Sequence, residues 1–273
     1  MREIYRGTWV IAYRELLRFV QERSRILSSF GMPLLFLVIF GAGFNRIVGT
    51  LAPGVDFIKF IYPGIVTMTV LMTSVFTGLS VVWDREFGFL KEVMVAPLSR
   101  TGIVLGKAAG GAAVAVIQGV IMLIPAPFLG IKLTPLSILQ IIVLLIIISL
   151  SLASLGILVA SRMRSQQGFH IIVQLIVFPL IFLSGIFFPV NSVPVWLQII
   201  SKLNPMTYGV DAIRQLFLVN NLSSAAGGLG ETNSIIGITV FGHTMSVLED
   251  LIVIAVIGSI TVVAATWVFG KQE

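Results

Sequence analysis

The sequence of 273 residues contains no cysteine and very few charged residues. Without thiols the chain can form neither a disulfide nor a cysteine-based metal site. Only 11% of its residues are charged, whereas soluble domains carry about 25%. Hydrophobic residues make up 57% of the chain, and the mean hydropathy is +1.04. These features exclude an ordinary soluble domain and indicate an integral membrane protein.

Groups for catalysis or metal binding are equally scarce. The two histidines, His170 and His243, lie 73 positions apart and lack the neighbouring ligands of a metal site. No ionisable residue falls near the middle of a long apolar run and no buried carboxylate pair is expected, which disfavours ion-coupled transport and intramembrane catalysis. The nearest approach to a phosphate-binding loop fails twice, at Thr101 and Ala108. We expect no enzyme activity and no cofactor on this chain, so energy for any work must come from a partner.

Charge-free apolar runs divide the chain into six candidate membrane spans. A span needs about 20 apolar residues, and the runs predict spans at about 27–47, 61–83, 104–129, 136–161, 169–189 and 248–269. An even number of spans puts both termini on one side of the membrane. That side holds 13 of the 18 Lys and Arg residues, so the positive-inside rule makes it cytoplasmic. The same rule accounts for the net charge of +6, and no nucleic-acid partner is expected.

The first 25 residues predict an amphipathic helix. Apolar side chains recur at spacings of three and four and share one helical face, at Tyr5, Trp9, Ala12, Leu16 and Phe19. Arg14 and Arg18 fall on the opposite face. A helix of this kind lies in the membrane interface, either as a plain anchor or with a further role.

Two stripes of residues at four-residue spacing mark the spans. In the first span the stripe is aromatic (Phe36, Phe40 and Phe44). There are three alternatives for it: it lines a path for an apolar substrate, it faces lipid, or it packs on a neighbouring helix. In the third span the stripe consists of glycines, which let helices approach closely, at Gly102, Gly106 and Gly110.

A charged stretch at residues 84–100 interrupts the apolar runs on the predicted cytoplasmic side. As a helix, residues 86–96 place most of their apolar side chains on one half of the circumference, and Gly88, Lys91 and Glu92 lie on the other side. Pro97 ends this helix. The stretch is either an interfacial helix between two spans or a docking helix for a soluble partner.

Beyond the fifth span, prolines 189, 194 and 205 divide the chain into helices that are too short to cross a membrane, within residues 194–219. Asp211 and Arg214 stand three positions apart and can form an ion pair. The segment is either a cap at the outer interface or an outer gate. Residues 220–246, rich in Gly and Ser, predict an outer loop that can hold a short hairpin.

Two blocks of the sequence resemble a known family. "DREFGFLKEVMVAPLSRTGIVLGK" at 84–107 resembles the cytoplasmic loop signature of ATP-binding-cassette (ABC) type-2 permeases, nearest to their daunorubicin-resistance group. "PLIFLSGIFFPVNSVPVWLQIISKLNPMTYGVDAIR" at 179–214 resembles the second signature of the same family. The blocks stand in the family's order, and the resemblance covers almost the whole chain.

The resemblance implies a single membrane domain over residues 1–273. Its fold would be an all-α integral membrane protein with six transmembrane helices. An interface helix over 1–25, a cytoplasmic coupling helix over 85–97 and outer re-entrant helices over 194–219 would complete it. The chain would sit in the cytoplasmic (inner) membrane of a prokaryote, with both termini in the cytoplasm. It would pair with a second copy or a second permease, and with an ABC ATPase subunit that binds ATP and Mg.

The resemblance also implies which residues carry the function. Contacts with the ATPase would come from Glu86, Phe87, Gly88, Leu90, Lys91, Glu92, Arg100, Arg162 and Arg164. Phe87, Leu90 and Met94 would hold the coupling helix to its own spans. The outer gate would consist of Phe182, Phe187, Phe188, Asn204, Pro205, Tyr208, Asp211 and Arg214.

The function implied is export of hydrophobic or amphipathic drug-like molecules, driven by the partner's ATP hydrolysis. The direction of transport and this substrate class rest on the resemblance. Export of a polysaccharide or a lipid by the same architecture is the alternative. A secondary transporter or channel, and a structural or lipid-modifying membrane protein, are the other classes still open.

Overall fold

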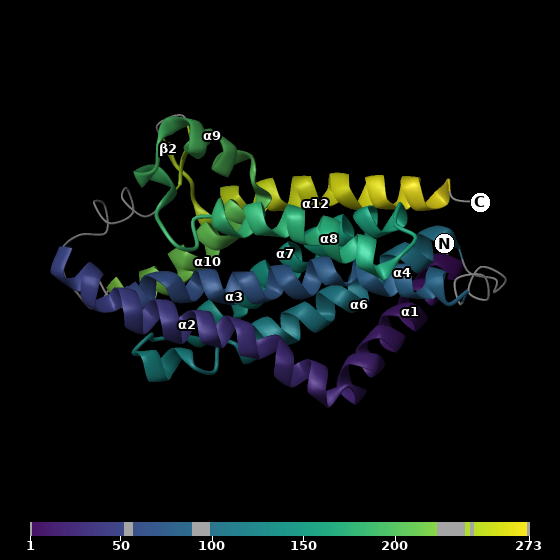
Figure 1. Ribbon diagram of the computed structural model, residues 1–273, viewed down its shortest axis with the longest axis horizontal. Coiled ribbons are helices and arrows are strands. Elements are labelled where there is room, and N and C mark those ends of the chain that lie inside the picture. The colour runs from purple at the N-terminus through teal and green to yellow at the C-terminus, as the bar shows by residue number, and fades with distance from the viewer. Residues whose placement is uncertain (1, 52–56, 89–98, 223–237, 241–242, 272–273) are drawn as a thin grey trace.

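A computed structural model describes residues 2–51, 57–88, 99–222, 238–240 and 243–271. Within these ranges the chain is a bundle of helices with one two-stranded hairpin (Figure 1). The helices are α1 (Arg2–Gln21), α2 (Arg23–Leu51), α3 (Phe57–Phe76), α4 (Gly78–Glu86), α6 (Arg100–Ile121), α7 (Pro135–Ser161), α8 (Gln166–Phe182), α9 (Val195–Leu203), α10 (Pro205–Leu222) and α12 (Val247–Gly270), with short 3-10 turns η1 (Ala126–Leu129) and η2 (Val190–Ser192). Strands β1 (Thr239–Val240) and β2 (His243–Thr244) pair antiparallel, with Thr239 opposite Thr244.

Several helical stretches are long and apolar enough to cross a membrane. Among the described residues four stretches meet both conditions, namely Phe57–Glu86, Arg100–Ile121, Pro135–Ser161 and Val247–Gly270. Two shorter apolar helices, Ser29–Gly41 and Gln166–Phe182, lie where the first and fifth spans are predicted. A nearly all-helical chain with these spans is consistent with an all-α membrane protein, and the count of six stays a prediction.

Two helices end earlier than the apolar runs suggest. The third apolar run continues to residue 129, but α6 ends at Ile121 and the chain turns through Pro125 into η1. The fifth run continues to residue 189, but α8 ends at Phe182. Gly185 follows with a φ of +78°, a conformation that glycine adopts without strain. Hydropathy therefore overestimates both helices, because the residues beyond them are apolar but lie in turns.

Helices α3 and α7 form the centre of the bundle. α3 contacts α2, α6, α7 and α10, and its side chains are buried along most of its length. Ser149 and Ser154 on α7 donate hydrogen bonds to the carbonyl oxygens of Ile146 and Leu150, as expected for hydroxyl groups in an apolar helix. These two hydroxyls are thus satisfied within α7, whereas the buried hydroxyl of Ser74 on α3 has no hydrogen-bond partner.

The glycine stripe of α6 packs against α1. A Cβ atom placed on Gly106 would lie 2.7 Å from the Cβ of Ile11, and one on Gly110 would lie 2.8 Å from the Cβ of Glu15. The stripe therefore allows a close helix approach, as predicted. The predicted apolar residues do share one face of this continuous helix. Along that face Phe19 is buried whereas Tyr5 and Trp9 are more than 70% exposed.

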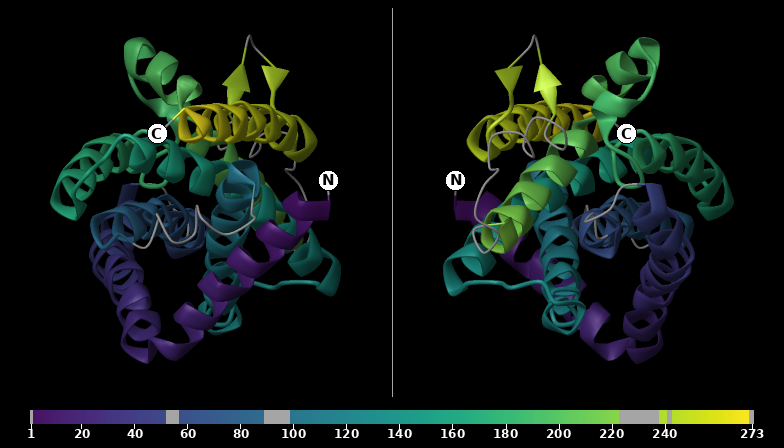
Figure 2. Two further views of the ribbon diagram at one scale, coloured as in Figure 1. Left: turned by 90° about the vertical axis from the view of Figure 1, so that its right-hand side faces the viewer. Right: turned by 90° about the vertical axis from the view of Figure 1, so that its left-hand side faces the viewer.

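The two ends of the bundle carry different structures. The start of α1 and the end of α12 lie at one end, close to the ends of α4 and α7 (Figure 1). The hairpin, α9 and the turn η2 lie toward the opposite end (Figures 1 and 2). This arrangement agrees with an even number of crossings, and it places the predicted coupling loops and the predicted outer gate far apart.

Candidate functional site

The predicted ATPase-contact residues that the structure describes lie at the end of the bundle that carries the start of α1. Glu86 closes α4, and its Oε2 accepts a hydrogen bond of 3.3 Å from the backbone N–H of Gln166, in the first turn of α8. Phe87 is 72% exposed, and Gly88 follows with a φ of +75°. Leu90, Lys91 and Glu92 lie outside the described residues, so the coupling helix itself is not tested.

Arg85 joins the two predicted contact loops. Its guanidinium donates to the carbonyl oxygens of Ser161 (2.9 Å) and Met163 (2.6 Å). These carbonyls close α7, and a cation at a helix C-terminus is stabilised by the helix dipole. Arg162 and Arg164 beside them are exposed. The end of α4 and the turn after α7 therefore form one basic surface with Arg85, Arg162 and Arg164, although 77 positions separate Arg85 from Arg162 in sequence.

Arg100 adds the last helix to this surface. It is exposed, and its Nη1 donates a 2.8 Å hydrogen bond to the carbonyl oxygen of Gly270 at the end of α12. Ser99 caps α6 by accepting from the N–H of Gly102. The helix that follows the predicted coupling segment thus has a capped N-terminus, and a hydrogen bond links it to the C-terminal helix.

A buried charge cluster lies just inside this surface, and the sequence analysis missed it. Lys107 Nζ lies 2.6 Å from Asp84 Oδ2 and 3.6 Å from Glu15 Oε1. Arg14 Nη2 lies 3.0 Å from the same Asp84 oxygen, and Ser80 accepts a 3.0 Å bond from Lys107. Lys107 is 1% exposed and Asp84 4%. The charge cluster (Arg14, Glu15, Asp84 and Lys107) therefore joins α1, α4 and α6 with two charges of each sign.

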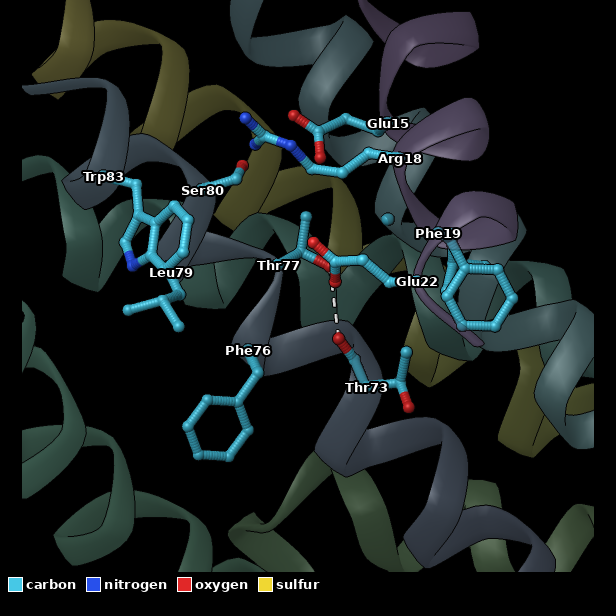
Figure 3. Close-up of a pocket in the computed structure, with 12 residues that line it drawn as sticks. Glu15, Arg18, Phe19, Glu22, Thr73, Phe76, Thr77, Leu79, Ser80 and Trp83 are labelled. Atoms are coloured by element: carbon cyan, nitrogen blue, oxygen red, sulfur yellow. Dashed lines mark hydrogen bonds between the residues drawn. The ribbon is translucent and has the colours of Figure 1, made fainter. Parts of the chain in front are cut away.

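A cavity opens beside the charge cluster. It has a volume of 360 Å³, and Figure 3 shows Glu15, Arg18, Phe19 and Glu22 on one side of it. The opposite side is lined from α3 and α4 by Thr73, Phe76, Thr77, Leu79, Ser80 and Trp83. Charged groups from α1 and hydroxyl groups from α3 and α4 thus line this cavity together with the aromatic side chains of Phe19, Phe76 and Trp83.

A second cavity of 290 Å³ adjoins the first and is less polar. The two share Thr73, Phe76 and Val114. The remaining lining residues of the second cavity are Ser29, Met32, Pro33, Met68, Thr69, Met72 and Gln118. Together the cavities run from the charged end of α1 toward the middle of α3, and their polarity falls along the way.

The predicted pathway residues and two of the predicted gate residues form one aromatic row. Phe36, Phe40 and Phe44 stack along α2, with ring centroids 5.4 and 5.5 Å apart. Phe187 packs against Phe40, with centroids 5.2 Å apart, and against Phe182 at the same distance. Two sets that the sequence analysis kept separate are therefore in contact, although Phe188 makes no ring contact in this row.

The other predicted gate residues hold the start of α10 to the last turn of α8 and to α9. Asn204 donates a 2.8 Å hydrogen bond to the carbonyl oxygen of Leu180 and accepts one from the N–H of Met206. Tyr208 donates to the carbonyl oxygen of Lys202 (2.7 Å). Pro205 begins α10, where the missing N–H of a proline has no cost.

Asp211 and Arg214 do not form the ion pair that their spacing suggests. Arg214 donates a 2.7 Å hydrogen bond to the carbonyl oxygen of Gly185, and its guanidinium lies 4.1 Å from the centre of the Phe60 ring. Asp211 instead accepts from Gln215 and lies beside Asp250 of α12. The expectation that no carboxylate pair is buried is therefore wrong, because α10 and α12 bring together two residues 39 positions apart.

Comparison with known proteins places the chain among membrane transporters. A family model described as "ABC-2 type transporter" matches residues 6–218. A putative transport permease ycf38 of Cyanophora paradoxa is 33% identical over 207 residues, which cover 73% of this chain and 71% of the relative. Nodulation protein J of Rhizobium leguminosarum bv. trifolii is 30% identical over 197 residues, covering 71% and 74%.

A third relative has a more specific name. The probable multidrug ABC transporter permease YbhR of Escherichia coli (strain K12) is 34% identical over 173 residues. These residues cover 61% of this chain and 45% of the relative. Residues 6–218, which the family model matches, include the basic surface, both cavities and most of α10.

Proposed function

Since this chain belongs to the ABC-2 type transporter family, we propose that it is the permease subunit of an exporter driven by a separate ABC ATPase. ATP and Mg would bind to that subunit, and this chain would carry no catalytic residue. Two permeases, either two copies of this chain or this chain with a second permease, would form the path through the bilayer. Both termini would face the cytoplasm of a prokaryotic cell, in its inner membrane.

The connection of the two predicted contact loops through Arg85 and Glu86 is the observation that carries this proposal. A partner that presses on residues 84–100 would act on α4, α7 and α8 together, because hydrogen bonds join their ends. The exposed bases Arg100, Arg162 and Arg164 would contact acidic groups of the ATPase. Movement imposed there would reach the aromatic row through α8, whose last residue is Phe182.

The coupling helix is tested by Leu90→Asp and by Glu92→Arg. We expect either change to abolish ATP-driven transport while the chain still inserts in the membrane, because each alters the side chains that would connect the ATPase to the spans. ATP hydrolysis and transport would be measured together in proteoliposomes that contain both subunits. Lys132→Glu, an exposed change beyond η1, is the control and should leave both rates unchanged.

Unchanged transport in the two coupling variants would refute the coupling role. Flux that follows an ion gradient when the ATPase is left out would favour a secondary transporter instead. Failure of the chain to purify with an ATPase subunit, or to alter its turnover, would contradict the whole proposal.

For the substrate, we favour a small hydrophobic or amphipathic molecule, and export of a polysaccharide or lipid is the alternative. The two joined cavities support the first class, because their volumes suit ligands of drug size. Their polarity falls from Glu15, Arg18 and Glu22 to Met32 and Met72, which matches a molecule with one polar end. The relative named a probable multidrug permease supports the same class.

The cavities are tested by Met72→Trp. The indole would fill part of the second cavity, so we expect transport of an amphipathic dye to fall about tenfold or more, as a changed pocket volume commonly causes. Leu139→Trp adds the same bulk on an exposed face of α7 and should have little effect. Equal transport by both variants, with normal assembly, would place the substrate path elsewhere.

A further inference from the structure

Two buried carboxyl groups meet at the end of the bundle that carries the hairpin. Asp211 of α10 is 2% exposed and Asp250 of α12 is fully buried. Gln215 Nε2 lies 3.0 Å from Asp211 Oδ2 and 3.4 Å from Asp250 Oδ2, so one amide group contacts both carboxyl groups. The remaining oxygen of each, Oδ1, is buried and has no hydrogen-bond partner.

An ionised carboxylate can only accept hydrogen bonds, so neither carboxyl group can donate to the other unless one of them holds a proton. Two carboxylates that share a buried site cannot both ionise without strong repulsion. The geometry of the carboxyl pair (Asp211 and Asp250) is therefore that of a site with one bound proton. The unpartnered Oδ1 atoms are consistent with this, because a second negative charge here would have no donor to stabilise it.

The charged groups around the carboxyl pair also favour one bound proton. Arg214, one turn along α10, attracts Asp211 electrostatically. With one shared proton the pair carries one negative charge, so the pair and Arg214 together are neutral. Glu249 repels Asp250, but its Oε2 lies at the surface, 3.3 Å from His243 Nε2. Tyr208 faces Asp250 from α10 and donates its proton away from the pair.

The other elements that pack on α10 and α12 bring few charges to the pair. α7 has no charged residue, and α3 has only Lys59, which points toward Gly130. α9 contributes Lys202, which is half-buried. The cations of α6, Arg100 and Lys107, lie in its first turns, where they contact α12's end and the charge cluster. No described base beyond Arg214 thus compensates a fully ionised pair.

The carboxyl pair holds several elements together. Asp211 Oδ2 accepts from the N–H of Ile238, just before β1 (3.1 Å), and Gln215 donates to the carbonyl oxygen of Met245, just after β2 (3.0 Å). The Thr239 hydroxyl donates a 3.0 Å hydrogen bond to Oδ1 of Asn191 in η2. We call α9, α10, η2, residues 238–240 and residues 243–245 the outer cap. The carboxyl pair fastens the outer cap to the first turn of α12.

We propose that Asp211 and Asp250 form a proton-binding site that keeps the outer cap fastened to α12 while one proton is bound. Loss of that proton leaves two adjacent buried negative charges, which repel, so α10 separates from α12 and the cap loosens. The proton leaves to water on the hairpin side of the membrane. A gating effect on export rests on the proposed function, whereas the proton site itself does not.

The proton site is tested on the purified full chain in lipid nanodiscs by infrared spectroscopy. We expect the wild-type chain to show the carbonyl band of one protonated carboxylic acid, which disappears as the pH rises from about 5 to about 9. Asp211→Asn and Asp250→Asn should each remove that band. The control is Glu249→Gln, which is adjacent in sequence, keeps the Ser246 capping box possible, and should retain the band.

Thermal unfolding gives a second readout. The folded pair binds one proton more than the unfolded chain near neutral pH, so the melting temperature of the wild-type chain should fall as the pH rises through the loss of the band. Either asparagine variant should lose this pH dependence, because its amide replaces the shared proton as the donor. A pH profile that both variants keep would overturn the proposal. A melting temperature raised by Na⁺ or Ca²⁺ in the wild type alone, with no protonated band, would overturn it in favour of a cation.

The gating effect is measured on the chain reconstituted with an ABC ATPase. We expect the transport rate of the wild type to rise with pH on the hairpin side, and the rate of Asp250→Asn to stay at the low-pH value. An infrared band with an unchanged transport profile would overturn the gating effect and leave the proton site standing. Absence of ATP-driven transport in the wild type would count against the proposed function and not against the band.

Discussion

Replacing Lys107 with methionine should lower the free energy of unfolding by about 3–5 kcal/mol, the usual cost of removing one partner from a buried ion pair. The lysine lies between Asp84 and Glu15, whose side chains are 4% and 11% exposed. Arg14 remains near them, but its side chain is 30% exposed and one cation cannot balance two acids. The effect should be visible as a lower melting temperature of the purified chain and as weaker contact of α1 with α6.

A double variant separates the lost ion pair from lost packing. Lys107→Met combined with Asp84→Asn removes one charge of each sign, so its loss should be smaller than the sum of the two single losses. Lys132→Met makes the same change at an exposed lysine and should alter stability by less than about 0.5 kcal/mol. A Lys107→Met chain as stable as the Lys132→Met chain would show that the charge cluster does not stabilise the fold.

Features that depend on neighbouring residues could be predicted from the sequence. The glycine stripe of α6 does pack closely on another helix. The apolar runs gave the positions of the long helices, because a span must be both helical and apolar. They gave poor helix ends at 121 and 182, since hydropathy does not distinguish a helix from an apolar turn.

Features that depend on which helices become neighbours could not be predicted. In the count of cytoplasmic Lys and Arg residues Lys107 is one base among thirteen, and only the packing of α1, α4 and α6 shows that it is buried with Asp84. The sequence suggests a pair of Asp211 with Arg214, because side chains three positions apart are neighbours on the surface of a helix. The contact of Asp211 with Asp250 has no local pattern. The local feature of Asp250 is its position in the first turn of an apolar helix. That position is as typical of a residue at the membrane interface as of a residue in a buried pair.

The same distinction explains why the largest steric effect is expected at Gly156, which no motif marks. A Cβ atom on Gly156 would lie 2.1 Å from the carbonyl oxygen of Val75, and one on Gly78 would lie 2.2 Å from the carbonyl oxygen of Gly156. Both contacts are with backbone, which cannot turn aside as a side chain can. α7 therefore touches the junction of α3 and α4 without room for any side chain.

Gly156→Leu should accordingly destabilise the chain by at least about 3 kcal/mol. Overpacking against side chains costs about 1–3 kcal/mol, and here the leucine would meet backbone, so the helices themselves must separate. The junction leads directly into α4, so the separation should also displace Asp84 and Arg85 and weaken the basic surface. Gly31→Ala in α2 is the matched control. A Cβ atom there meets nothing within 4 Å, and alanine favours the helix by up to about 1 kcal/mol. Comparable melting temperatures for Gly156→Leu and Gly31→Ala would mean that α7 does not approach α3 and α4 this closely.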